Sequence, residues 1–342
     1  MNSFRPSLKC ICNFVILLAF SHICLADDSV EIAYNLATNG AAASQKQNHD
    51  LAIDYYSKAI AIDTNYAYAY FARAQEYYGK SDFSTSLKDL NEAIRIGPEP
   101  QFYLLRAAVF SRLHKTDDAI NNDSEAIRLK PSYADAYVSR ANEYVFKGAY
   151  DKALEDYDAA IQTKPSIPHV FAMRANAYRL NGDYERAVVD CNIAIKIDPR
   201  DASVYAVRGL VFFTYGNYTN AIADFQKAIS QDMNCTVAYN NLAWLLCVCP
   251  QKELRDGRKA LQYARKACEL QFWSDPYSLG TLAAAFAEVG SFDEAVKWET
   301  KAIKIGFPPK DSEQAQMIFK LYKKHQPYYE KPKMSANSTR QP

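Results

Sequence analysis

The feature that most constrains this chain is a repeat of about 34 residues that runs through most of its length. Four prolines mark the repeat, and they stand 33 or 34 residues apart, at Pro98, Pro131, Pro165 and Pro199. Between the prolines the same residue types return at the same positions. Such a chain folds as a stack of similar small units, because each unit can bury its apolar face only against its neighbours.

The residue pattern within one repeat predicts two amphipathic helices joined by a short turn. Small residues recur seven apart in the second helix, as at Ala153 and Ala160, with Tyr157 between them. Small residues let two helices approach closely, and the larger side chains fill the remaining space. Glycine allows the backbone geometry that ends the first helix. Gly-x-Tyr or Gly-x-Phe turns stand at residues 148–150, 182–184, 216–218 and 290–292.

This pattern resembles the tetratricopeptide repeat family, in which aromatic, small, Gly-x-Tyr and proline positions follow one another with this period. The resemblance covers residues 31–308 and implies an all-α fold, a right-handed superhelical solenoid of antiparallel helix pairs. A polar helix at 309–330 would cap its end, and residues 331–342 are expected to be disordered. About eight units are expected, at 33–66, 67–99, 100–133, 134–167, 168–201, 202–235, 236–275 and 276–308.

The seventh unit departs from the regular period. Ala243 and Ala260 are 17 residues apart, where the regular units have 12, so the turn between its helices is longer by five residues. Its sequence AWLLCVCP, which ends at Pro250, resembles the C-terminal units of bacterial exported tetratricopeptide proteins. Those units read LAWLLATCP, RDG and DTLAAAYAE in succession. Cys247 stands where that pattern has alanine, and Gly280 stands where it has aspartate.

The amino-terminal residues have the pattern of a secretory signal peptide. Arg5 and Lys9 are basic, residues 10–20 are apolar, and cleavage is predicted after Ala26, which makes 1–26 the signal. The protein is therefore expected to be periplasmic or secreted. An uncleaved membrane anchor is the alternative, although the apolar run is short for a bilayer.

The charge balance argues against a nucleic-acid partner. Forty basic and 39 acidic residues give a formal net charge of +1. A protein that binds nucleic acid needs a surplus of basic residues to neutralise phosphates. We therefore expect no nucleic-acid binding, and membrane association only through an uncleaved signal.

The cysteines outside the predicted signal are odd in number and do not form a disulfide framework. Side chains two residues apart on a helix point about 200° away from each other, so Cys247 and Cys249 cannot share a metal on a regular helix. We expect buried free thiols and no metal site; a disulfide between Cys235 and Cys268 is the alternative. The five are Cys191, Cys235, Cys247, Cys249 and Cys268.

A recurring arginine is followed 16 residues later by an aspartate in four units. An ion pair that recurs in these units is interpreted as structural, since this spacing can bring the two side chains together across a helix pair; ligand binding is the alternative. Arg106 breaks the pattern, because Asn122 stands at the aspartate position. The four pairs are Arg73 with Asp89, Arg140 with Asp156, Arg174 with Asp190 and Arg208 with Asp224.

The sequence has no motif that predicts catalysis. HExxH, GxSxG, a glycine-rich phosphate loop and Cys-x-x-Cys are all missing, and the histidines are scattered among different units. We expect no enzyme and no cofactor. The interpretation is a scaffold that binds a peptide or protein segment on the concave face of the solenoid. The alternatives are a substrate-delivering subunit of an envelope enzyme and a self-assembling structural protein, and an oligomer is compatible with either.

The resemblance to the family also identifies candidate binding residues, because set positions of the first helix in each unit line the concave face. Some members clamp the terminal carboxylate of a peptide with lysines at such positions, and those lysines are absent here. The candidate peptide-binding residues are Gln75 in the second unit, Asn142 and Phe146 in the fourth, His169, Asn176 and Arg179 in the fifth, and Asn240, Asn241 and Trp244 in the seventh.

Overall fold

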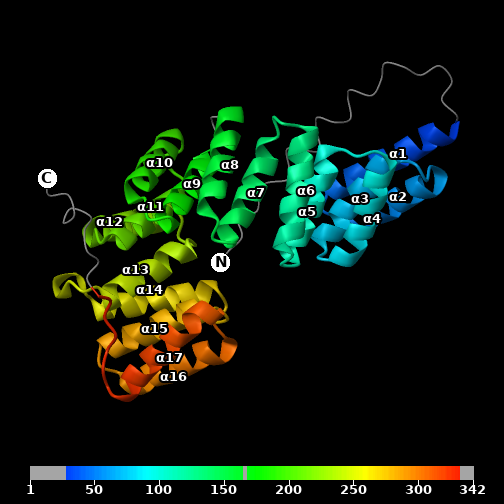
Figure 1. The fold of residues 1–342 in the computed structure, drawn as a ribbon. Helices are drawn as coiled ribbons and strands as arrows, with labels where there is room; N and C mark the ends of the chain where they lie inside the picture. Colours follow the sequence, from blue (N-terminus) through cyan, green and yellow to red (C-terminus); the bar gives the residue numbers. More distant parts are fainter. Residues whose placement is uncertain (1–27, 165–167, 332–342) are drawn as a thin grey trace. The chain divides into compact units, whose positions relative to one another are not determined.

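The computed structural model describes residues 28–164 and 168–331, and every regular element in these residues is a helix. The helices form consecutive antiparallel pairs, and one further helix ends the series (Figure 1). The predicted all-α fold of stacked helix pairs is confirmed. The predicted signal at 1–26 and residues 332–342 of the predicted tail lie outside the described residues.

Seven pairs are regular, and in each the second helix begins within five residues of the end of the first. The pair α13 (Thr236–Val248) and α14 (Gly257–Leu270) has a longer connection, and α17 (Pro309–Lys323) is unpaired in sequence. The regular pairs are α1 (Asp28–Gln45) with α2 (His49–Ile62), α3 (Ala67–Gly79) with α4 (Phe83–Ile96), α5 (Pro100–Arg112) with α6 (Thr116–Leu129), α7 (Ala134–Phe146) with α8 (Tyr150–Thr163), α9 (Pro168–Leu180) with α10 (Tyr184–Ile197), α11 (Ala202–Tyr215) with α12 (Tyr218–Gln231), and α15 (Pro276–Glu288) with α16 (Phe292–Ile305).

The chain divides into two compact units between Pro131 and Ser132, the first with α1–α6 and the second with α7–α17. In the second unit, first helices of neighbouring pairs contact one another from α9 through α11 and α13 to α15. Second helices of neighbouring pairs in the described residues make no comparable contact. The side formed by the first helices is therefore the more closely packed, concave side of this unit.

The turns between paired helices require a left-handed backbone conformation. Gly182 has φ of +86° and Gly216 has φ of +85°, and the glycines of the other two predicted turns are similar. In the earlier pairs the corresponding turns hold Gln47, Ser81 and His114, with φ between 57° and 63°. The predicted role of glycine is confirmed, and the fold imposes the same conformation where glycine is absent.

The recurring arginine binds the aspartate 16 residues later in all four predicted pairs. In each case two guanidinium nitrogens donate to the two carboxylate oxygens at 2.7–2.8 Å, between the two helices of one pair. Arg106 donates instead to Asn122 Oδ1 at 2.7 Å. Arg208 also reaches the preceding pair, where Asn192 Oδ1 accepts at 2.6 Å. The structural interpretation of these pairs is confirmed.

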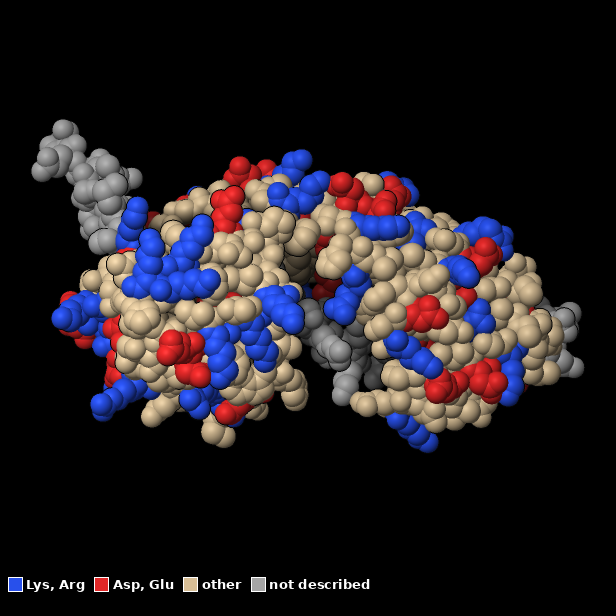
Figure 2. Space-filling view, turned by 90° about the horizontal axis from the view of Figure 1, so that it is seen from below, with Lys and Arg blue, Asp and Glu red and all other residues tan. Residues whose placement is uncertain are grey.

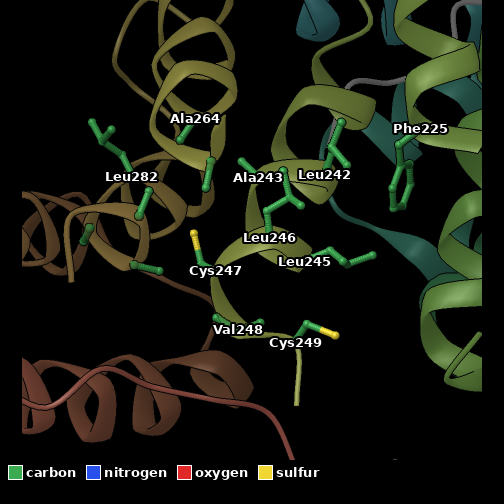
Figure 3. Close-up of a cluster of buried hydrophobic side chains, with 14 of the residues drawn as sticks. Phe225, Leu242, Ala243, Leu245, Leu246, Cys247, Val248, Cys249, Ala264 and Leu282 are labelled. Carbon is green, nitrogen blue, oxygen red and sulfur yellow. The ribbon is translucent and has the colours of Figure 1, made fainter. Parts of the chain in front are cut away.

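The irregular pair forms the centre of a large apolar cluster in the second unit. A short 3-10 turn at Lys252–Leu254 bridges the helices, and Asp256 caps α14 by accepting from the Lys259 N–H. Figure 3 shows the sulfur atoms of Cys247 and Cys249 pointing in different directions. All five cysteines in the described residues are free, including Cys235 and Cys268, which were the candidate disulfide. Burial raises the pKa of Cys268 to about 12, so its thiol stays protonated.

No group of three or more metal-ligating side chains could hold a metal ion within residues 28–164 and 168–331. None of the helices in this described part of the chain combines the length and apolar character that crossing a bilayer requires. On the face seen in Figure 2, acidic and basic side chains occur together over much of the surface.

The last helix ends earlier than the sequence predicts. The prediction places a helix at 309–330, whereas α17 ends at Lys323 and buries Ala315, Ile318 and Tyr322. His325 has a φ of +56°, and Pro327 follows it. A left-handed residue and a proline cannot continue a helix, so the chain leaves α17 in an extended form.

Candidate peptide-binding surface

The candidate residues lie on the first helices of their pairs, as the family pattern implies. Gln75 is on α3 in the first unit and is half-buried. The other candidates lie in the second unit, on α7, α9 and α13. The surface described below is that of the second unit alone.

On α7, the position of the Asn142 side chain is set by a buried tyrosine of α8. Tyr157 is 2% exposed, and its hydroxyl donates to Asn142 Oδ1 at 2.6 Å. Burial raises the pKa of Tyr157, so the hydroxyl keeps its proton and remains a donor. The Asn142 residue is itself exposed. Because its oxygen is engaged, the amide NH₂ is the group that Asn142 can offer to a ligand.

On α9, Asn176 and Arg179 lie one helical turn apart and form a second pair of polar side chains. Arg179 Nε and Nη2 donate to Asn176 Oδ1 at 3.1 and 2.9 Å. Arg179 Nη1 reaches Thr214 Oγ1 on α11, at 3.5 Å. The guanidinium therefore bridges two neighbouring pairs, and the amide NH₂ of Asn176 is left as a donor.

Arg179 has no carboxylate partner among the described residues, in contrast to the four arginines of the structural pairs. Burial lowers its pKa, and the groups that oppose this effect are the tyrosines Tyr184 and Tyr150. A half-buried guanidinium without a counter-charge is costly, and a carboxylate could bind it through two parallel hydrogen bonds. The arrangement is suited to an acidic group on a ligand.

The structure does not bring His169 to this pair. His169 lies in the first turn of α9 and Arg179 in its last, so the two are about 15 Å apart along the helix axis. Burial lowers the pKa of His169, and this effect outweighs the opposite effect of Asp135 and Asp201. The imidazole is therefore neutral at pH 7. Phe146, at the end of α7, is 65% exposed and offers an apolar contact.

Two of the three candidates in the seventh unit, Asn241 and Trp244, are engaged by the chain itself. Asn241 Nδ2 donates to the Val237 carbonyl at 2.9 Å. Trp244 Nε1 donates to Glu330 Oε1 at 3.0 Å, a contact between residues 86 positions apart. Asn240 Oδ1 is buried without a hydrogen bond among the described residues. Trp244 is thus not open to a ligand in this structure.

Sequence reasoning did not include Thr214, Tyr150 or Tyr184, which surround Arg179. Thr214 is the thirteenth residue of α11, a position that the family pattern already identifies as inward-facing. The two tyrosines belong to Gly-x-Tyr turns and were interpreted only as turn residues. Their place in the turn also brings them close to the end of the first helix, where Arg179 lies.

Two family models for the tetratricopeptide repeat match the chain, one at residues 40–66 and the other at 138–202 and 172–234. Over these residues the chain has the tetratricopeptide repeat pattern. Proteins with this repeat are generally scaffolds for protein–protein interaction, and no enzyme family is detected for the chain.

One curated protein with a related sequence matches only part of this chain. A DnaJ homolog subfamily C member 7 homolog from Dictyostelium discoideum is 25% identical over 134 residues, which are 34% of this chain and 25% of that protein. The match thus spans about a quarter of that relative's length.

Two solved structures resemble nearly the whole chain. A tetratricopeptide repeat protein from Parabacteroides merdae superposes with a TM-score of 0.58 at 15% identity, over 87% of this chain and 100% of its own. Yeast Tom70 superposes with a TM-score of 0.61 at 15% identity, over 90% of this chain and 66% of its own. At such identities the likeness shows the fold alone, a tetratricopeptide-like superhelix.

Proposed function

We propose that this protein is a non-enzymatic scaffold that binds an extended, acidic peptide or protein segment on the concave face of its second unit. The observation that carries the proposal is the guanidinium of Arg179, which lies half-buried without a carboxylate partner in the described residues. The recurring arginines of this unit, Arg140, Arg174 and Arg208, have their carboxylates on the adjacent second helix. Arg179 is not one of them and is available to an acidic group from outside.

The surface around Arg179 supplies the other contacts that an extended segment needs. The amide NH₂ groups of Asn142 and Asn176 can donate to main-chain carbonyls of a ligand, because their oxygens already accept from Tyr157 and Arg179. Phe146 offers an exposed apolar side chain. Main-chain hydrogen bonds combined with apolar and charged anchors are a common mode of peptide recognition.

The proposal can be tested with an array of acidic and neutral peptides presented to the full chain. Peptides with Asp or Glu should bind, and Arg179→Glu should weaken the binding by about 10- to 100-fold, since a hydrogen bond to a charged group contributes about 1.5–3 kcal/mol. Arg258→Glu, at an exposed position in the first turn of α14, makes the same charge change away from this surface and should have little effect.

The combined variant Asn142→Ala, Asn176→Ala and Arg179→Glu should abolish the binding. Circular dichroism would show that each variant retains its helices. If the combined variant binds the same peptides with unchanged affinity, the proposed surface is wrong.

The proposed compartment is outside the cytoplasm, either the periplasm or the exterior of the cell. It is supported by basic Arg5 and Lys9, the apolar residues 10–20 and the small residue Ala26. Fractionation of the source cells and amino-terminal sequencing of the purified protein would test it. A mature chain that begins at Asp27 is the expected result, and a chain that keeps residues 1–26 in the cytoplasm would contradict it.

A further inference from the structure

After α17, residues 326–331 run back across the end of α13; we call them the C-terminal strap. The Glu330 N–H donates to the Val248 carbonyl at 2.8 Å. The Glu330 carboxylate accepts from Trp244 Nε1 at 3.0 Å, and the Tyr328 ring lies 6.0 Å from the Trp244 ring, centroid to centroid. One main-chain bond, one acid contact and one aromatic contact thus converge on the last two turns of α13.

Tyr329 makes the other contact of the strap, with an ion pair that joins the connector to α15. The guanidinium of Arg255 lies 3.7 Å from the centre of the Tyr329 ring. The Tyr329 hydroxyl lies near the Glu288 carboxylate, which pairs with Arg255 at 3.6 Å. We call the surface that the strap covers, on α13, the connector at 249–256 and the end of α15, the groove.

These contacts have the form of peptide recognition, with Tyr328 as the anchor that packs against the apolar cluster and accepts a hydrogen bond from Gln314 at 3.3 Å. An extended segment is held by its main chain, while successive side chains meet an indole, a guanidinium and an N–H donor. Tyr329 remains 40% exposed, and the strap contains no helix. A segment held by so few contacts opens locally with a small free energy, far below that of global unfolding.

The strap also leaves polar atoms of the groove unsatisfied. Glu288 Oε2 is buried without a hydrogen bond among the described residues, and Arg255 Nε has only the long contact of 3.6 Å with Glu288 Oε1. The side chains of Arg255 and Glu288 are only 11% and 14% exposed. Buried polar atoms without partners are costly, so an occupant that satisfied them would bind more tightly than the strap does.

We propose that this groove is a second peptide-binding site, and that the strap occupies it as a tethered ligand until a partner replaces it. The partner is an extended protein segment with two successive aromatic residues followed by an acidic one, as in Tyr328, Tyr329 and Glu330. The site is separate from the surface around Arg179, and the proposal does not depend on that one.

The test uses a labelled peptide with the sequence of residues 326–331, QPYYEK, added to the full chain. The tether gives the strap an effective concentration in the millimolar range, so the wild-type chain should bind the peptide weakly. The double variant Tyr328→Ala with Glu330→Ala frees the groove and should bind it at least about tenfold more tightly. Because the peptide contains a glutamate, both chains are also measured with Arg179→Glu, which removes acidic-peptide binding at the first surface. The roughly tenfold difference between the two chains should persist in that background, which separates the two sites.

Two controls define the recognition. Trp244→Phe in the double variant removes the N–H donor while it keeps an aromatic ring, and it should weaken binding. A peptide with Ala in place of the first Tyr and the Glu should not bind, and this control changes nothing in the protein. Equal affinity of the wild-type chain and the double variant, or no binding by either, would overturn the proposal. A double variant that loses its helical circular dichroism would also overturn it, because the strap would then belong to the core.

Discussion

At the residue scale, each arginine and aspartate pair joins the two helices of one repeat. Arg208 and Asp224 show the arrangement, with two hydrogen bonds of 2.7 and 2.8 Å and side chains 21% and 9% exposed. A carboxylate this deeply buried must be paired, because removal of one partner leaves the other charge without compensation. The chain itself contains a neutral version, in which Asn122 accepts from Arg106.

This comparison predicts how the pair responds to substitution. Asp224→Ala should lower the free energy of unfolding by about 2–4 kcal/mol, because Arg208 would remain half-buried without a counter-charge, with only the neutral Asn192 as an acceptor. Asp224→Asn should cost less, since the amide oxygen can still accept, as Asn122 does. Urea denaturation of both variants would measure the difference. Equal losses for Ala and Asn would contradict the prediction.

Glu299 is a second residue whose environment has consequences for stability. It lies on α16, is 2% exposed, and has Tyr322 of α17 near it. No described basic side chain pairs with it, and burial raises its pKa to about 7. The folded protein therefore binds a proton here at a pH at which the unfolded chain has released it.

Stability should consequently fall as the pH rises from about 4.5 to about 7, the ordinary and the raised pKa of this group. Glu299→Gln removes the effect. The free energy of unfolding of Glu299→Gln should exceed that of the wild type by nearly zero at pH 4.5 and by on the order of 3 kcal/mol at pH 8. Urea denaturation across this pH range would measure this difference. The exposed Glu313→Gln is the control, and a pH-independent difference for Glu299→Gln would refute the assignment.

At the element scale, the turn between the helices of a pair is the most demanding part of each repeat. The residue two positions before the second helix has positive φ in every one of the described regular pairs, whether it is glycine or Gln47, Ser81 or His114. Non-glycine residues lose about 1–2 kcal/mol in this conformation. The fold therefore tolerates strain at some turns and avoids it with glycine at others.

Gly182→Ala should destabilise the protein by about 1 kcal/mol or more, although no atom lies within 4 Å of the added methyl group. The loss would come from the backbone, whose φ is +86°. Gly97→Ala is the matched control, since its φ of −162° suits any residue and its methyl group would also meet nothing within 4 Å. It should be neutral or slightly stabilising. Thermal denaturation followed by circular dichroism would compare the two.

At the scale of the whole molecule, a stack of repeats holds its structure through contacts between neighbours. The chain divides into two compact units between Pro131 and Ser132. All three tryptophans, Trp244, Trp273 and Trp298, belong to the second unit. Tryptophan fluorescence thus reports on that unit, whereas circular dichroism at 222 nm reports on helices throughout the chain.

The two signals should not follow one common urea transition, because nearest-neighbour stabilisation allows parts of a repeat array to unfold separately. Asp89→Ala in the first unit should shift the circular dichroism curve and leave the fluorescence midpoint unchanged. Asp224→Ala should shift both signals. Coincident curves for both variants would show that the chain unfolds as a single cooperative structure.

Much of the fold followed from the sequence because the contacts of a repeat are local. The start of every first helix from α3 onward, the glycine turns and the arginine–aspartate pairs all lie within one period of about 34 residues. For the candidate site, the pattern placed Asn142, Asn176 and Arg179 on first helices. It did not reveal that Arg179 lacks a carboxylate, because its surroundings come from α8, α10 and α11 together.

The sequence by itself determined the helices, their pairing and the structural ion pairs, since each depends on residues that recur with the repeat. Only the tertiary structure decided the end of α17, the burial of Glu299 and the course of the strap. The contact between Trp244 and Glu330 joins residues 86 positions apart, more than two repeats. No periodic pattern encodes such a contact, because it depends on how the last helices pack and on where the chain turns after them.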